Sequence, residues 1–355
     1  MMRVGEKPGR TPALDGFRGL AILAVMAYHF QTDVFPSGSL GVDLFFVLSG
    51  FLITGLLLKE QATRGNVDLR LFYVRRALRL WPALTALVAY AAVQGALKGH
   101  PLSISDAAQA LTYTTNLVIA FSNHQDPLAL TWSLGVEEQF YLLWPPLVVL
   151  ALARGRILRL SLCAFAVLLV VEVAEAALIT GVRTYFLPTS RFYELVAGGL
   201  LAVLLEREAA RHAVSRLCIL PVALLGLVGI GVAVLLPEDR PLAVGTLIGW
   251  VVTLSALAVI GHVSTQSGSW FSRGLGSRPS AWIGQRSYSI YLWHLVVLGV
   301  VADHLHLRPA ESLPLLVGLS LIVGHLSFEL IEKPFLRLKP YPASGAVPRI
   351  VEAAL

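Results

Sequence analysis

The chain has 355 residues, of which 56% are hydrophobic and only 14% are charged, and its mean hydropathy is +0.71. Soluble domains carry about 25% charged residues, so this composition excludes an ordinary water-soluble protein and favours one that lies almost wholly in a lipid bilayer. The formal charge of +6 would also suit a nucleic-acid-binding protein, but the basic residues lie between apolar segments rather than in one cluster, so we expect no nucleic-acid partner.

Ten apolar segments could each form a membrane-spanning helix, which takes about 20 mostly apolar residues. We therefore predict an all-α, polytopic integral membrane bundle of about ten transmembrane helices over residues 1–340, with a short tail over 341–355. The segment 106–121 is too short and too polar for a confident span, and we expect an interfacial or re-entrant helix there. The expected spans are residues 14–30, 41–58, 77–97, 133–152, 157–179, 186–205, 217–236, 242–262, 281–302 and 313–331.

The Lys and Arg residues indicate the orientation, because positive residues concentrate in cytoplasmic loops. With the N-terminus inside and ten spans, 22 of the 28 Lys and Arg residues fall in cytoplasmic segments and five in external ones, while Arg18 lies within the first span. This asymmetry predicts a multi-pass protein of the cell membrane with both termini in the cytoplasm.

The first helix carries three ionisable residues, Asp15, Arg18 and His29. Such groups are costly inside a bilayer, so each is a functional candidate. Arg18 and His29 are eleven residues apart, which is almost three full turns, so they share one face about 16 Å apart along the axis. Asp15 lies one turn before Arg18 and can pair with it. The alternative is a structural Asp15–Arg18 pair with His29 at the headgroups.

The second helix enters from the outside, so Asp43 starts near the His29 end of the first helix. A carboxylate there could orient an imidazole and raise its basicity, although an N-cap role suits Asp43 equally well. Ser49 and Gly50 lie in the middle of the same helix, where small residues allow close helix packing, and we expect packing to be their role.

Three arginines, Arg75, Arg76 and Arg79, cluster at the inner mouth of the third helix, because their spacings of three and four residues place them on neighbouring turns. Ordinary anchoring of a helix at the cytoplasmic surface explains part of this pattern. The same cluster also makes an anion site suited to phosphates. The sequence leaves anchoring and ligand binding open.

The fourth helix opens with Trp132 and Ser133 and carries two adjacent carboxylates, Glu137 and Glu138, in its outer part. Carboxylates do not anchor helices at the membrane surface, whereas basic and aromatic residues do. We therefore favour the interpretation that Glu137 or Glu138 faces a water-filled cavity. Further along the chain, Arg191 and Glu194 are three residues apart and predict a local salt bridge. His294 lies within the ninth span, where a hydrogen bond to a neighbouring helix is its expected role.

The candidate residues thus sort by depth in the membrane. A basic group of Arg18, Arg75, Arg76 and Arg79 is expected at the cytoplasmic mouth. A second group of His29, Asp43, Glu137 and Glu138 is expected toward the outside, about 16 Å away along the first helix. This layout suits a long ligand with an anionic head inside and a reactive tip near His29, such as a phosphate-bearing acyl carrier.

Six motifs in order carry a resemblance to a known family: LDGFRGLAILAVMAYHF, GVDLFFVLSGFLI, RRALRLWP, TWSLGVEEQFYLLWP, SYSIYLWHL and IEKP. Together they cover nearly the whole chain. In these motifs, and in the spacing of Arg18 and His29, the chain resembles the acyltransferase 3 family of membrane-bound acyltransferases that use acyl-CoA.

The resemblance implies transfer of an acyl group, most simply acetyl, from cytoplasmic acyl-CoA to a hydroxyl of a carbohydrate, a glycolipid or a secondary metabolite such as a macrolide. It implies that His29 is catalytic, oriented by Asp43, Glu137 or Glu138, and that no metal is needed. General-base catalysis by His29 and a covalent acyl-histidine intermediate are the two mechanisms left open. We expect the donor-binding set to be Arg18, Arg75, Arg76, Arg79, Trp132 and Ser133, with structural support from Asp15, Arg191 and Glu194.

Members of the family that modify cell-surface glycans often carry a C-terminal extracytoplasmic domain of the SGNH type, and we expect no such domain within these 355 residues. We therefore expect an acceptor that is presented at the membrane or diffuses freely. A multi-pass transporter or proton-coupled permease is the alternative, because ionisable residues at depth also mark transport pathways. The absence of a visible inverted repeat and the concentration of arginines at one mouth argue against it.

Overall fold

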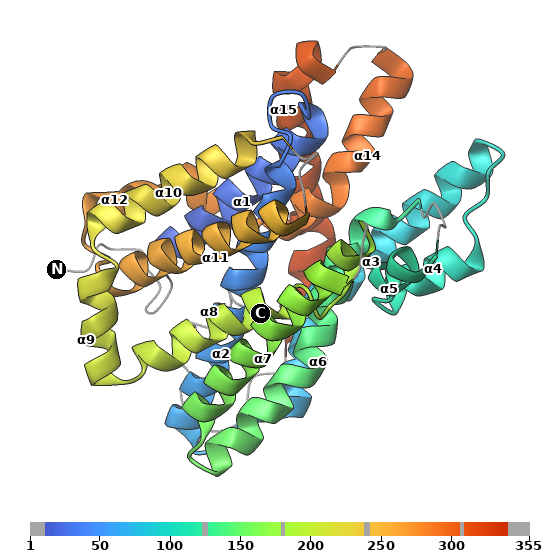
Figure 1. The fold of residues 1–355 in the computed structure, drawn as a ribbon. Helices are drawn as coiled ribbons and strands as arrows, with labels where there is room; N and C mark the ends of the chain where they lie inside the picture. Colours follow the sequence, from blue (N-terminus) through green and yellow to red (C-terminus); the bar gives the residue numbers. More distant parts are fainter. Residues whose placement is uncertain (1–10, 123–126, 179–181, 238–241, 306–308, 340–355) are drawn as a thin grey trace.

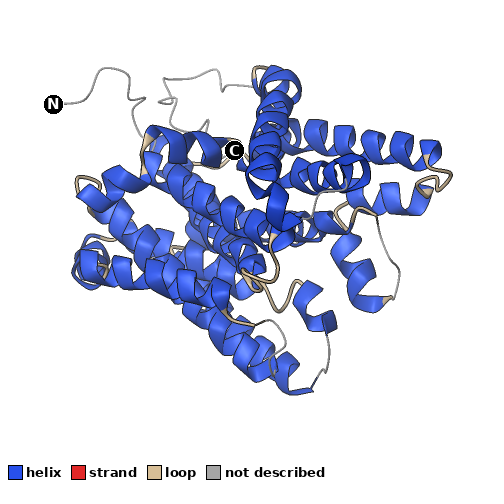
Figure 2. Ribbon diagram, turned by 90° about the horizontal axis from the view of Figure 1, so that it is seen from above, coloured by secondary structure: helices blue, strands red, loops and turns tan. Residues whose placement is uncertain are grey.

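The computed structural model describes residues 11–122, 127–178, 182–237, 242–305 and 309–339, and within these ranges every regular element is a helix (Figure 2). The long helices are α1 (Pro12–Phe30), α2 (Gly41–Arg64), α3 (Leu69–Leu97), α6 (Trp132–Ala153), α7 (Ile157–Leu178), α8 (Phe192–Leu205), α10 (Leu220–Leu235), α11 (Leu242–Thr265), α14 (Ser287–Leu305) and α15 (Pro309–Ser327). The short ones are η1 (Gly38–Leu40), α4 (Ile104–Leu111), α5 (Thr115–Phe121), η2 (Ala129–Thr131), η3 (Val182–Phe186), α9 (Glu208–Leu217), α12 (Trp270–Leu275), α13 (Arg278–Gln285), η4 (Phe328–Glu332) and α16 (Lys333–Leu336).

The all-α membrane bundle predicted from the sequence is confirmed, and each of the ten expected spans contains one long helix (Figure 1). By length and composition, six described helices are able to cross a bilayer, or seven if the bent pair α9 and α10, which meet at 66°, forms one span. The number of ten spans therefore stays a prediction. Several helices that matter for the site, such as α8 with 14 residues, are shorter than a full crossing.

The segment 106–121 forms no spanning helix. It is divided into α4 and α5, and the break between them contains Tyr113 in the left-handed region at φ 59°. A non-glycine residue adopts this conformation only where its surroundings hold it there. The α5 helix packs against α6, where Gln139 donates hydrogen bonds to the Tyr113 carbonyl oxygen and to Asn116, and α4 packs against α3.

Close helix packing builds the core around α2. Gly50 of α2 meets α8 so tightly that a Cβ atom placed on it would lie 1.7 Å from the carbonyl oxygen of Leu195. Gly198 of α8 makes the reciprocal contact, because its Cβ atom would lie 1.9 Å from the carbonyl oxygen of Val47. Small residues at such crossings let two backbones approach closely. The packing role predicted for Gly50 is confirmed. The α1 helix packs against α13 in the same manner through Gly19 and Gly284, and against the end of α12 through Gly16.

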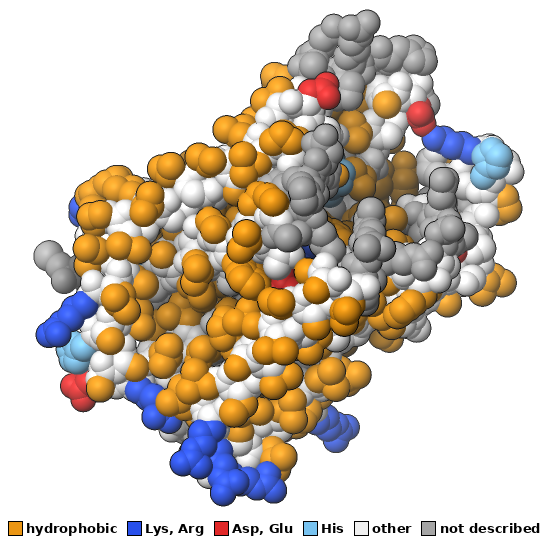
Figure 3. Space-filling view, in the orientation of Figure 1, with side chains coloured by type: hydrophobic (Ala, Val, Ile, Leu, Met, Phe, Trp, Pro, Cys, Tyr) orange, Lys and Arg blue, Asp and Glu red, His pale blue; other side chains and the backbone are white. Residues whose placement is uncertain are grey.

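The outer surface suits a lipid environment. Hydrophobic side chains cover most of the face shown in Figure 3, and Lys and Arg side chains gather at its lower edge. Large apolar residues such as Val170 of α7 and Leu225 of α10 are 69% and 71% exposed. An apolar patch of this extent does not occur on ordinary soluble monomers, so lipid is the solvent for this surface.

Candidate active site

A cavity of about 990 Å³ lies where the C-terminal end of α1 meets α2, α6, α7, α8 and α14. We call it the large cavity. Its wall includes His29 of α1, Asp43 of α2, Trp132 of α6, Arg191 at the start of α8, and His294 of α14. The volume is at the upper end of the range for small-molecule sites, about 300–1,000 Å³. A ligand the size of a disaccharide or larger therefore fits beside His29.

The imidazole of His29 is held by the backbone and by a second histidine. Its Nδ1 lies 2.9 Å from the carbonyl oxygen of Val25, one turn earlier in α1. The same Nδ1 lies 3.3 Å from Nε2 of His294, and the two ring centroids are 4.9 Å apart. Because Nδ1 takes up these contacts, Nε2 is the nitrogen that can serve a substrate in the large cavity. His294 is fully buried, and its hydrogen bond to a neighbouring helix, predicted from the sequence, is confirmed.

Asp43 is paired with an arginine and not with His29. Its Oδ1 accepts a hydrogen bond from Nη1 of Arg191 at 3.3 Å, and the same Nη1 donates to Oε1 of Glu194 at 3.2 Å. The local salt bridge predicted for Arg191 and Glu194 is therefore present, with Asp43 as its third member. Asp43 and Glu194 are fully buried and the Arg191 side chain is 11% exposed, and Asp43 Oδ2 and Glu194 Oε2 accept no hydrogen bond from a described residue. Of these two carboxylates, Asp43 lies in the wall of the large cavity.

The remaining wall of the large cavity combines aromatic rings with two more carboxylates. The indole ring of Trp132 contacts the rings of Tyr185 and Phe186, with centroids 5.0 and 5.2 Å away. Glu172 of α7 accepts a hydrogen bond from the indole N–H of Trp250 at 2.7 Å, and Glu175 lies one turn further along. No role could be predicted for Glu172 and Glu175, because nothing in the apolar pattern of α7 shows which face meets a cavity.

A second, much smaller pocket of about 50 Å³ contains the arginines. We call it the arginine pocket. Arg18 of α1 converges there with Arg76 and Arg79 of α3, and Glu137 and Tyr141 of α6 complete the wall. The predicted meeting of the α1 arginine with the arginines of the third helix is thus seen in the structure. Arg75 is buried but does not line this pocket.

Glu137 lines the arginine pocket and Glu138 pairs with Arg76 beside it, which differs from their predicted place beside His29. Glu138 Oε1 accepts a hydrogen bond from Nε of Arg76 at 2.7 Å, and Glu137 Oε1 accepts one from the Ser49 hydroxyl at 2.6 Å. Ser49 lies six residues beyond Asp43, about 9 Å further along α2. Glu137 and Glu138 are five and six residues beyond Trp132, so about one and a half turns of α6 carry these carboxylates past the large cavity. Ser49 binds a carboxylate as well as lying at a helix contact.

The Arg76–Glu138 pair offers a direct test of what holds α3 against α6. We expect Glu138→Gln to lower the stability of the protein by about 3 kcal/mol, because it removes the carboxylate that is hydrogen-bonded to the buried guanidinium of Arg76. Thermal unfolding of the purified protein in detergent measures this change, with the exposed Glu206→Gln as the control. An equal melting temperature for the two variants would show that the Arg76–Glu138 pair makes no net contribution to the stability of the protein.

Three further placements differ from expectation. Trp132 lies in the wall of the large cavity, and the Ser133 hydroxyl is 2.7 Å from the Tyr291 hydroxyl, so neither lies with the arginines. Asp15 accepts a hydrogen bond from Gln285 of α13 at 3.5 Å, a partner that the sequence did not predict.

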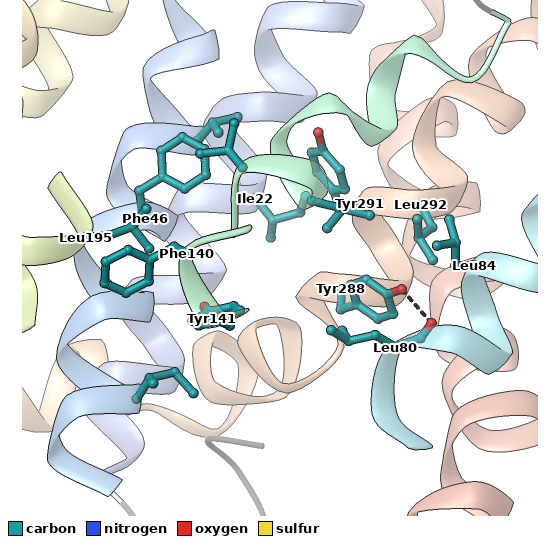
Figure 4. Close-up of a cluster of buried hydrophobic side chains, with 14 of the residues drawn as sticks. Ile22, Phe46, Leu80, Leu84, Phe140, Tyr141, Leu195, Tyr288, Tyr291 and Leu292 are labelled. Atoms are coloured by element: carbon teal, nitrogen blue, oxygen red, sulfur yellow. Dashed lines mark hydrogen bonds between the residues drawn. The ribbon is translucent and has the colours of Figure 1, made fainter. Parts of the chain in front are cut away.

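A thin layer of side chains separates the two sites. Along α1 the lining passes from Arg18 in the arginine pocket to Val25 in the large cavity, and along α14 it passes from Tyr288 to Tyr291. These steps correspond to about 10 Å and about 5 Å along the helix axes. Ile22 and Phe46, both fully buried, belong to the apolar cluster at this level (Figure 4). We call this layer the septum.

Comparisons with known proteins place the chain in a family. A family model described as an acyltransferase domain matches residues 11–328. O-acetyltransferase OatA of Staphylococcus aureus (strain NCTC 8325 / PS 47) is 29% identical over 369 residues, covering 96% of this chain and 60% of the relative. Peptidoglycan O-acetyltransferase OatA of Listeria monocytogenes is 30% identical over 348 residues, covering 91% of this chain and 55% of the relative. The chain thus spans little more than half the length of these relatives.

No solved structure matches this chain. The family model nevertheless covers nearly all of the described helices, including those that carry the large cavity and the arginine pocket. This match decides between the enzyme and transporter classes raised by the sequence. The chain belongs to the acyltransferase 3 family.

Proposed function

We propose that this protein transfers an acetyl group from acetyl-CoA to a hydroxyl of a carbohydrate-containing acceptor, with His29 as the general base. The donor approaches from the cytoplasmic side, with its phosphates near the arginine pocket, and the acceptor lies in the large cavity. The observation that carries this proposal is the arrangement on one face of α1, where Arg18 lines the arginine pocket and His29 lines the large cavity about 16 Å away.

The charges of the arginine pocket fit a phosphate-bearing donor. Arg18, Arg76 and Arg79 contribute three guanidinium groups, and guanidinium is the group best suited to phosphate. A volume of about 50 Å³ admits no nucleotide, so the donor's head stays at the mouth of this pocket and only its narrow arm extends toward His29.

The large cavity fits a sugar. Its aromatic wall of Trp132, Tyr185 and Phe186 can pack against the apolar face of a pyranose ring. Asp43 Oδ2 and Glu175 Oε2, which accept no hydrogen bond from a described residue, can accept hydrogen bonds from its hydroxyls. The relatives named O-acetyltransferases, one of them of peptidoglycan, support a carbohydrate acceptor. A glycolipid or a glycosylated metabolite such as a macrolide presents the same chemistry.

The reaction follows from the geometry of His29. Nε2 of the neutral ring accepts the proton of the acceptor hydroxyl as its oxygen attacks the thioester carbonyl. The ester C–O bond forms, the C–S bond breaks, and the thiolate leaves with the proton returned by His29. General-base catalysis of this kind contributes about 10²–10⁴-fold. The thioester must pass the septum before it reaches His29.

The decisive experiment uses the purified wild-type chain in lipid nanodiscs with acetyl-labelled acetyl-CoA. Acceptors are simple glycosides, a host glycolipid extract and a macrolide, and the readouts are free thiol release and label transfer. We expect thiol release that depends on an acceptor and a labelled ester product. If no thiol is released with acetyl-CoA or with longer acyl-CoAs, the proposal fails and substrate flux across the membrane becomes the activity to measure.

The role of the arginine pocket is tested by donor kinetics. We expect Arg18→Gln and Arg79→Gln each to raise the KM for acetyl-CoA about tenfold, equivalent to ~1.4 kcal/mol, because each removes a charge-assisted hydrogen bond to phosphate. The KM for the acceptor should not change. Arg64→Gln, which breaks only a pair with Glu60 at the end of α2, is the control. An unchanged KM for acetyl-CoA in the first two variants would show that these arginines do not bind the donor, and would favour a role in anchoring the helices at the membrane surface.

A further inference from the structure

We infer that His294 is a positioning residue that fixes the orientation and the tautomer of His29, so that Nε2 of His29 is always the unprotonated nitrogen in the large cavity. This inference rests on the proposed function of His29 as general base and adds to it a second residue from α14. Nothing in the motif that contains His294 distinguishes it from a buried packing residue, and the assignment comes from its contacts.

The contacts of His294 are those of a fully buried side chain with a defined hydrogen-bonding pattern. Its Nδ1 lies 2.6 Å from the carbonyl oxygen of Tyr291, one turn earlier in α14. Its Nε2 lies 3.3 Å from Nδ1 of His29. The Tyr291 hydroxyl donates to the carbonyl oxygen of Leu130 at 2.7 Å, which ties this turn of α14 to the segment before α6. The ring of His294 is therefore fixed at both nitrogens.

These contacts determine where the protons lie. A carbonyl oxygen only accepts hydrogen bonds, so the Nδ1 atom of each histidine must carry the proton that points at Tyr291 or at Val25. Neutral His294 then presents the lone pair of Nε2, which accepts from Nδ1–H of His29. The other tautomer of His29 would direct its Nδ1 lone pair at the Val25 oxygen and at the Nε2 lone pair of His294, and both contacts would be repulsive.

The same arrangement assists the reaction itself. When His29 takes the hydroxyl proton on Nε2, the ring becomes a cation whose Nδ1–H has two acceptors, the Val25 carbonyl and Nε2 of His294. No proton passes to His294 in this scheme, because the proton on Nε2 of His29 returns to the leaving thiolate. His294 acts only through His29, in the way that the partner of a catalytic or ligating imidazole sets its tautomer.

A packing role is the competing explanation, since the ring of His294 also lies 6.2 Å from the ring of Phe30 and 5.7 Å from that of Tyr291. The two roles make different demands on position 294. Packing is satisfied by leucine, which has similar bulk. Positioning requires an acceptor where Nε2 lies, which the amide of glutamine can supply. The shorter amide of asparagine reaches only the place of Nδ1.

The test is a kinetic series of His294→Gln, His294→Asn and His294→Leu with acetyl-CoA and the acceptor found for the wild type. We expect kcat to fall about 10- to 100-fold for Asn and Leu and to be largely restored in Gln, with both KM values within twofold of wild type. Melting temperatures in detergent show whether each variant is folded, and the Gln variant keeps the test valid if Leu or Asn does not fold.

Two results would overturn the inference: a folded Leu variant with wild-type kcat, or a folded Gln variant that loses as much kcat as Leu. A wild-type chain without any transfer activity would instead overturn the proposed function, so the two failures are distinguishable.

Discussion

His29→Ala is expected to reduce acetyl transfer by about 10²–10⁴-fold, to the level of the background reaction, while leaving the KM for acetyl-CoA nearly unchanged. The variant removes the imidazole whose Nδ1 contacts the Val25 carbonyl and His294, and whose Nε2 is the nitrogen that can serve a substrate in the large cavity. The arginine pocket is untouched, because Arg18 lies almost three turns away on the same helix. Initial rates of label transfer with purified variants measure the effect.

His212→Ala is the matched control, since His212 is exposed on α9 and far from both sites in the chain. Measurable transfer by the His29→Ala protein at more than a tenth of the wild-type rate would remove His29 from the mechanism. The same preparations also separate the two mechanisms left open by the sequence. Mass spectrometry of wild-type protein quenched with donor alone detects an acyl-histidine if one forms, and a general base gives no such adduct.

Gly50→Ala is expected to have the largest effect on folding, with a loss of stability of about 3 kcal/mol or more. The new methyl carbon would lie 1.7 Å from the carbonyl oxygen of Leu195, so α2 and α8 would have to separate along their whole contact. Overpacking of a tight core costs about 1–3 kcal/mol, and rigid backbone atoms leave little room for adjustment. The yield of monodisperse protein and its melting temperature in detergent are the measurements.

Gly55→Ala provides the control on the same helix, because the nearest atom to its added carbon is 4.0 Å away. Alanine favours a helix over glycine by about 1 kcal/mol, so this variant should be as stable as wild type or slightly more so. If Gly50→Ala and Gly55→Ala melt together, the close crossing of α2 and α8 is not what holds this part of the bundle.

The sequence predicted the fold well because lipid imposes simple rules. A bilayer selects apolar segments of fixed length, and each expected span contains a helix. The sequence did not predict how long each helix is in the folded bundle or where a helix bends. Helices such as α8 and the bent pair α9–α10 depend on tertiary contacts, and an apolar run carries no signal for a bend of 66°.

The sequence identified most of the individual residues of the two sites, but it did not predict correctly which of them lie together. Arg18 and His29 could be related because one helix fixes their spacing. Glu137 and Glu138 were assigned to the wrong partners, because their depth depends on where α6 begins and how α6 is offset against α2. His294, Glu172 and Glu175 could not be assigned to the large cavity, since α7 and α14 are apolar on most faces and periodicity does not reveal which face is inside.

The septum has a consequence for the cell as well as for the reaction. A membrane enzyme that takes its donor on one side and its acceptor on the other has two aqueous sites facing each other across a short distance. If water connected them, protons and other ions would flow down the membrane potential, at about 2.3 kcal/mol per charge per 100 mV. Ile22 and Phe46 are fully buried in the apolar cluster at the level of the septum, and apolar side chains there oppose the entry of water. In the proposed reaction, this layer would let an acetyl group be exchanged between the two sites while keeping the membrane electrically insulated.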